Sequence, residues 1–90
     1  MVDVILDPLF ENKFSKIKDK NLKIKIIKQV QKIKNNPEIG KPMMYLRKGT
    51  RELYIKPFRL SYLIKEGVVY ILDLYHKDEQ WFLNRENYLN

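Results

Sequence analysis

The sequence predicts an α+β domain in which an N-terminal strand and an antiparallel helical hairpin pack on a twisted antiparallel β-sheet. Three observations support this fold class. Apolar residues recur with helical spacing between residues 7 and 35, they alternate between residues 43 and 76, and an Asn-Asn-Pro sequence at 35–37 separates the two regions. We expect a single domain over residues 1–90, close to the smallest size that folds alone. Because the chain has no cysteine, an apolar core has to stabilise it without disulfides.

The first elements are a strand and a helix. Residues 2–6 are mostly β-branched or aliphatic, which predicts a short strand. Asp7 and Pro8 then favour a helix start, because an Asp side chain accepts from free N–H groups and Pro suits the first helical position. The apolar face of this helix is predicted to contain Phe10, Phe14 and Ile17.

A second helix is predicted after a break at residues 19–21. It ends at residues 35–37, because Pro37 cannot continue a helix and disfavours helical backbone in the residue before it. Its apolar face is predicted to contain Leu22, Ile26, Val30 and Ile33. The two helices are expected to form the hairpin.

The C-terminal half has the pattern of a sheet. Strands are predicted at residues 43–47, 51–56, 58–64 and 68–76. Residues 65–67 are expected to form a three-residue hairpin loop with Gly67 in the left-handed conformation. The strand at 68–76 is apolar almost throughout, as is typical of a central strand. Residues 79–90 are expected to form a short C-terminal helix or tail.

The positive charge is concentrated in the predicted hairpin. The formal net charge is +7, and residues 13–34 contain nine lysines and one acid, Asp19, which gives this segment +8. The remaining residues therefore have a net charge of −1, the difference between +7 and +8. This segment either attracts an acidic partner or a phosphate backbone, or is simply a solvated helix face.

Several classes of protein are not expected. The first ten residues contain acids where a secretory signal has its basic region, and the longest apolar runs are too short to span a bilayer. We therefore expect a cytoplasmic protein with no membrane contact. With one histidine, no cysteine and no glycine-rich phosphate loop, neither a metal nor an organic cofactor is expected.

Three motifs in order carry a family resemblance. Gly-Thr-Arg-Glu-Leu at 49–53, Phe-Arg-Leu-Ser-Tyr at 58–62 and Tyr-His-Lys at 75–77 follow two basic helices, and this arrangement resembles toxins of the RelE/ParE superfamily. The resemblance covers almost the whole chain and implies a single RelE-like toxin domain. It also implies an acidic, RelB-like antitoxin that neutralises the toxin in a hetero-oligomeric complex.

The family leaves three functions open. RelE-like members cut mRNA in the ribosomal A site, where the 2′-hydroxyl attacks the adjacent phosphate without a metal, and this is the function expected here. ParE-like members share the fold and inhibit DNA gyrase. The third alternative is a weakly active homologue that still binds an antitoxin.

Metal-free RNA cleavage needs a base, an acid and cations that stabilise the charged transition state. We expect the catalytic residues to be Arg59, His76 and Lys77. Arg59 corresponds to the arginine of the family's second motif and can hold a phosphate with two parallel hydrogen bonds. The structural alternative for Arg59 is an ion pair with Asp73 or Glu52. His76 is the only histidine, and the alternative is that it has no role at the strand end.

Five further residues are candidates for RNA or phosphate binding: Arg51, Lys56, Arg47, Lys48 and Trp81. Each also has a structural interpretation. Arg51 can pair with an acid near the strand edge, the two loop cations can be solvated, and Trp81 can anchor the tail rather than stack on a base.

The chain also departs from the family pattern. Glu52 and Tyr54 stand where some RelE-like members have lysines, and His76 or Lys77 replaces an arginine. Trp81 or Phe82 stands in place of a C-terminal tyrosine, and neither can transfer a proton.

Overall fold

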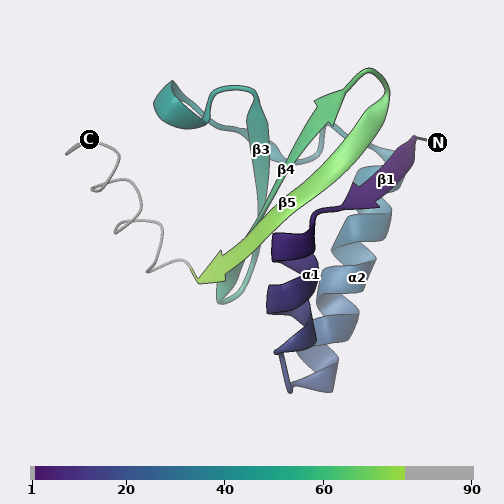
Figure 1. Cartoon of the computed structure of the whole chain (residues 1–90), viewed down its shortest axis with the longest axis vertical. Coiled ribbons are helices and arrows are strands. Elements are labelled where there is room, and N and C mark those ends of the chain that lie inside the picture. Colours follow the sequence, from purple (N-terminus) through teal and green to yellow (C-terminus); the bar gives the residue numbers. More distant parts are fainter. Residues whose placement is uncertain (1, 77–90) are drawn as a thin grey trace.

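A computed structural model of the chain describes residues 2–76, and two helices cover one face of a five-stranded sheet (Figure 1). The strand order is β1-β5-β4-β3-β2. The elements are β1 (Asp3–Leu6), α1 (Pro8–Ser15), α2 (Lys20–Asn35), β2 (Lys41–Pro42), the 3-10 turn η1 (Tyr45–Arg47), β3 (Thr50–Ile55), β4 (Phe58–Lys65) and β5 (Val68–His76). The expected α+β class is confirmed, whereas the expected C-terminal helix or tail lies outside the described residues.

The sheet is mixed rather than antiparallel as predicted. Strands β2 to β5 pair antiparallel, but β1 pairs parallel to β5, with Asp3 opposite Val68 and Leu6 opposite Ile71. A parallel pair needs a long crossover connection, and the helical hairpin between β1 and the rest of the sheet provides part of one. Periodicity does not contain strand direction, so only the tertiary structure gives this feature.

Both helices start at aspartate caps. Asp7 Oδ1 accepts from the Leu9 N–H at 2.8 Å, and Pro8 is the first helical residue, as predicted. Asp19 Oδ1 accepts from the N–H groups of Asn21 and Leu22 at 2.9 and 3.2 Å, so the break at residues 19–21 is itself the cap of α2.

The core lies between the helices and the sheet. The apolar faces predicted for the helices are confirmed, because all of their members are buried or pack against the buried cluster. The side chains from the sheet that are fully buried in this core are Leu60, Tyr62, Val69, Ile71 and Leu74, and Tyr75 is fully buried outside it.

Two connections differ from the prediction. The strand predicted at residues 43–47 does not form. The two-residue strand β2 ends just before it, at Pro42, and η1 occupies Tyr45–Arg47. Antiparallel pairing stops soon after the Met43 N–H donates to the Thr50 carbonyl at 2.9 Å. The β4–β5 hairpin has a two-residue turn, since Glu66 and Gly67 both have positive φ, 52° and 77°.

Tyr62 attaches the α2–β2 connection to the core. Its hydroxyl accepts from the Gly40 N–H at 2.8 Å and donates to the Pro37 carbonyl at 2.6 Å. Burial raises the pKa of Tyr62 above the ordinary tyrosine value, although the Gly40 hydrogen bond and the charge of Arg51 oppose this shift. Arg51 donates to the Gly40 and Glu38 carbonyls at 2.8 and 3.1 Å.

The space at Gly40 gives the first testable prediction. A Cβ at this position would lie 2.5 Å from Tyr62 Oη, so Gly40→Ala should lower the free energy of unfolding by about 1–3 kcal/mol. Urea denaturation measures the loss. Gly49→Ala serves as the control for backbone strain without crowding, because its φ is 99° and nothing lies within 4 Å of its Cβ position. An unchanged midpoint for Gly40→Ala would contradict this packing.

Candidate functional site

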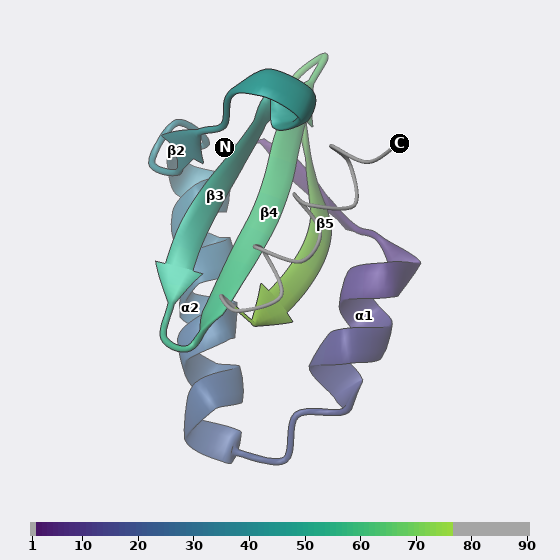
Figure 2. The ribbon, with the colours of Figure 1, turned by 90° about the vertical axis from the view of Figure 1, so that its left-hand side faces the viewer.

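The face of the sheet opposite the two helices is here called the open face (Figure 2). Alternation and register assign its members. Glu52 pairs with Ser61 and Tyr54 with Arg59, while Tyr75 lies opposite Arg59 on the other side of β4. The positions between them, such as Leu60 and Leu74, belong to the core on the helix side.

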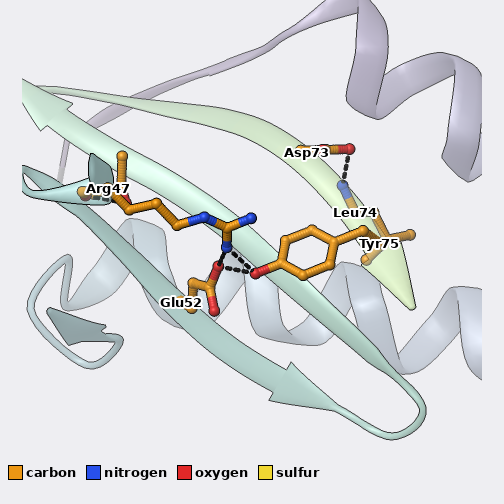
Figure 3. Close-up of polar contacts among 6 residues, drawn as sticks. Arg47, Glu52, Asp73, Leu74 and Tyr75 are labelled. Atoms are coloured by element: carbon orange, nitrogen blue, oxygen red, sulfur yellow. Dashed lines mark hydrogen bonds and ion pairs between the residues drawn. The ribbon is translucent and has the colours of Figure 1, made fainter. Parts of the chain in front are cut away.

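A buried network joins a loop to two strands on the open face (Figure 3). Arg47 Nη1 donates to Glu52 Oε2 at 2.6 Å and also to the Tyr75 hydroxyl. The Tyr75 hydroxyl in turn donates to the same Glu52 oxygen. The side chains of Glu52 and Arg47 are only 3% and 18% exposed, and the Arg47 guanidinium carbon lies 4.9 Å from the centre of the Tyr75 ring. This Arg47–Glu52–Tyr75 network therefore neutralises a buried carboxylate.

The network keeps the Tyr75 hydroxyl protonated. Burial raises the pKa of Tyr75 well above 10.0, and the hydrogen bond to Glu52 raises it further because it stabilises the protonated hydroxyl. Tyr75 therefore remains a hydrogen-bond donor at neutral pH. Glu52 Oε1 is buried and accepts no hydrogen bond from the described residues.

Arg59 lies next to the network but outside it. Its guanidinium carbon is 5.2 Å from the centre of the Tyr54 ring, and its buried Nε has no hydrogen-bond partner in the described part of the chain. Both acids considered as partners pair with other cations. Asp73 is 2.8 Å from Lys13 Nζ, and Glu52 pairs with Arg47. Within residues 2–76, the charge of Arg59 is therefore not neutralised by an ion pair.

His76 belongs to the opposite face of the sheet. It is opposite Phe58 in the register, and the two rings meet edge to face with centres 5.9 Å apart. Arg59 and His76 thus leave opposite faces, although they lie in the last two β4–β5 pairs at one end of the sheet. The structure does not bring the two expected catalytic side chains together on one face.

On the helix side, His76 borders a cleft of about 410 Å³ between the α1–α2 connection and the end of β5. Its walls are apolar at Ile17, Leu22 and Phe58. Lysines 13, 16 and 18 also line it.

The other candidate residues have different surroundings. Arg51 holds backbone carbonyls rather than the acid that was expected as its structural partner, and Arg47 is part of the network. Lys48 and Lys56 are exposed in connections at opposite ends of β3. Lys77 and Trp81 lie outside the described residues.

Sequence reasoning missed the Arg47–Glu52–Tyr75 network. Glu52 was noted as a replacement for a family lysine and as a possible partner of Arg59, and nothing in the spacing selected Tyr75. An acid within an alternating strand was the available signal, but its partners are 5 and 23 residues away.

Metal and membrane features were also sought in residues 2–76. No group of three or more histidines, cysteines or acids lies close enough there to hold a metal ion. None of the helices in that range has the length and apolar character needed to cross a bilayer.

Several solved toxin structures have the same fold as this chain. The toxin–antitoxin complex RelBE2 from Mycobacterium tuberculosis matches with a TM-score of 0.74 and 20% identity, over 84% of this chain and 98% of that chain. The isolated E. coli RelE toxin matches with a TM-score of 0.72 and 12% identity, over 94% and 98%. The YoeB dimer from Staphylococcus aureus gives 0.69 and 19%, over 83% and 95%. At such identities the likeness shows a common fold.

The family follows from the sequence itself. Residues 4–81 match the model of the ParE toxin of type II toxin–antitoxin systems, and the chain belongs to this family within the RelE/ParE superfamily. It is a toxin of a type II toxin–antitoxin system. No curated protein is similar enough to count as a relative.

The buried network gives the second prediction. Arg47→Met leaves the Glu52 carboxylate buried without a cation, so the free energy of unfolding should fall by about 3–5 kcal/mol. Adding Glu52→Gln removes the unpaired charge but keeps an acceptor for Tyr75, and at least half of the loss should return. Denaturant unfolding of the two single variants and the double variant measures this coupling. A purely additive result would mean that the two side chains do not depend on each other.

Proposed function

We propose that this toxin is a RelE-like, metal-free endoribonuclease that cuts mRNA in the ribosomal A site, with Arg59 as the residue that binds the scissile phosphate. The observation that carries the proposal is that Arg59 forms no ion pair within residues 2–76. A guanidinium next to a buried ion pair, with its Nε donor unused by the described residues, is suited to a phosphate group.

The neighbours of Arg59 support this role. The Tyr54 ring lies beside the guanidinium and Tyr75 is opposite it in the register, so the side chain is bordered by aromatic groups. Such surroundings exclude water and strengthen the attraction between the cation and the negative transition state. The Arg47–Glu52–Tyr75 network keeps Glu52 from forming an ion pair with Arg59.

We assign proton transfer to His76 within this proposal. It is the only histidine, and it lies in the cross-strand pair adjacent to Arg59. An RNA strand that crosses this end of the sheet would pass both side chains. Lys77 directly follows His76 and is proposed as an additional phosphate contact, as are the exposed Lys48 and Lys56.

A second function, inhibition of DNA gyrase, is favoured by two observations. The matching family model is that of the ParE toxin, and Glu52 and Tyr54 replace lysines that some RelE-like members have. Inhibition of supercoiling by the purified protein distinguishes this function from RNA cleavage.

The proposed partner is an acidic antitoxin. Similar structures were solved as complexes of RelE with RelB and of YoeB with YefM. In this chain, residues 13–34 have a net charge of +8, and α2 exposes most of its lysines to solvent. An acidic chain would be attracted to this surface.

The third prediction concerns Arg59. Arg59→Ala should slow cleavage of mRNA on programmed ribosomes by about 10²–10³-fold, because one preorganised charge is lost from the transition state. Arg59→Lys keeps the charge but loses the bidentate geometry, and should recover only part of the rate. Lys32→Ala, at an exposed position of α2 on the helix side of the sheet, is the matched control and should cut normally. Intact transcripts and normal protein synthesis in cells expressing the wild-type protein would contradict the ribonuclease assignment.

The fourth prediction concerns the antitoxin. Association with the proposed acidic antitoxin should slow as salt rises, because the Debye length falls to about 3 Å at 1 M ionic strength. Replacing Lys20, Lys25 and Lys28 of α2 by Gln should weaken this salt dependence, whereas the same change at Lys41, Lys48 and Lys65 should not. Stopped-flow kinetics measures the rates. An association rate unchanged by salt would mean that the lysine surface is not the binding site.

A further inference from the structure

An aromatic residue is held in solvent by an unfavourable backbone conformation at the start of η1. Tyr45 is 82% exposed, and its φ of 60° lies in the left-handed region that residues other than Gly, Asn and Asp rarely adopt. Met44 before it is 68% exposed. Conformations of this kind persist only where the surrounding structure enforces them, and they are common at ligand-binding sites.

The surrounding structure does enforce this one. The η1 turn ends at Arg47, whose guanidinium is fixed by Glu52 and Tyr75. Thr50 Oγ1 donates to the Arg47 carbonyl at 2.7 Å, and the Lys48 N–H donates to the Tyr45 carbonyl at 3.0 Å. The buried network thus fixes the backbone of the turn, so the exposed Tyr45 residue is already in place before a ligand binds.

The turn lies on the same side of the sheet as the proposed RNA site. In Figures 1 and 2, η1 projects beyond the sheet on the side away from the helices, at the end where β3 begins. Arg59 pairs with Tyr54 near the other end of β3, and the strand from Thr50 to Tyr54 spans about 14 Å. A single RNA strand lying along the open face can therefore reach both places.

The charge around the turn indicates the kind of ligand. Residues 39–51 contain four cations. Arg47 pairs with Glu52, whereas Lys41, Lys48 and Arg51 form no ion pair within the described residues. An exposed aromatic ring among cations is the combination with which proteins hold single-stranded nucleic acids, because bases stack on the ring while the cations attract the phosphates.

We propose that Tyr45 is a stacking platform for one unpaired base of the RNA strand whose phosphate Arg59 binds. The inference rests on the proposed ribonuclease function and adds a residue that positions the substrate away from the cleavage site. Tyr45 acts by binding a base, so it sets which nucleotide aligns with Arg59 and takes no part in proton transfer.

Two variants distinguish the effect of the Tyr45 ring from the effect of the backbone conformation at this position. Tyr45→Phe keeps the ring, whereas Tyr45→Asn removes it and tolerates the left-handed conformation. Ile27→Ala, an exposed apolar side chain on α2, is the matched control. The probe is a single-stranded RNA oligonucleotide with one 2-aminopurine, whose fluorescence falls on stacking, and cleavage of mRNA on programmed ribosomes is measured in parallel.

Tyr45→Asn should weaken binding of the probe by about 5- to 150-fold, abolish the fluorescence change and shift the cut positions, with thermal stability kept or raised. Tyr45→Phe and Ile27→Ala should behave as the wild type. If Tyr45→Asn binds the probe and cuts as the wild type does, the platform is wrong while the ribonuclease function stands. Loss of antitoxin binding alone would make the turn a protein contact and overturn the inference. Failure of the wild-type protein to bind or cut RNA at all would overturn both proposals.

Discussion

The buried carboxylate of Glu52 is the constraint on which the open face depends. A charge that is only 3% exposed has to be paired, and Arg47 from η1 and Tyr75 from β5 pair it. Glu52 and Tyr75 lie on strands that are not neighbours, because β4 runs between them. They meet across β4 near Ser61, whose small side chain is opposite Glu52 in the register. One network thus fixes the η1 turn, the face of β3 and the orientation of Tyr75.

The positions of the acids determine which cations form an ion pair. Asp7 and Asp19 cap the two helices, Asp73 holds Lys13, and Glu52 holds Arg47. Arg59 has no ion-pair partner within the described residues, even though Asp73 and Glu52 both belong to strands that pair with β4. A small chain with few acids can therefore leave one partly buried arginine with an unneutralised charge, at a cost in stability that is typical of binding sites.

The common fold leaves the activity to particular residues. RelE-like and ParE-like toxins share the sheet and the hairpin, so the helices and core of this chain do not distinguish between them. In the proposed ribonuclease, the residues at the shared end of β4 and β5 make this distinction. There, Arg59 leaves one face and His76 the other, so an RNA strand would have to cross the end of the sheet to meet both. His76 therefore differs from Arg59 in its surroundings, because it contacts Phe58 and borders the lysine-lined cleft on the helix side.

The helices, the three long strands and the apolar faces could be predicted from the sequence, because helix caps, proline positions and hydrophobic periodicity are local properties of the chain. The Asp7-Pro8 start of α1, the end of α2 before Pro37 and the bounds of β5 all follow from such local signals. Only the folded chain shows the parallel pairing of β1, the replacement of a predicted strand by η1, and the surroundings of Arg47, Arg51 and Arg59. Arg47 was a candidate either for contact with RNA or for simple solvation, and its guanidinium instead lies against a glutamate five residues away and a tyrosine 28 residues away. Ion pairs form between residues that the fold brings together, such as Lys13 of α1 with Asp73 of β5, and no periodicity in the sequence records which acid meets which cation.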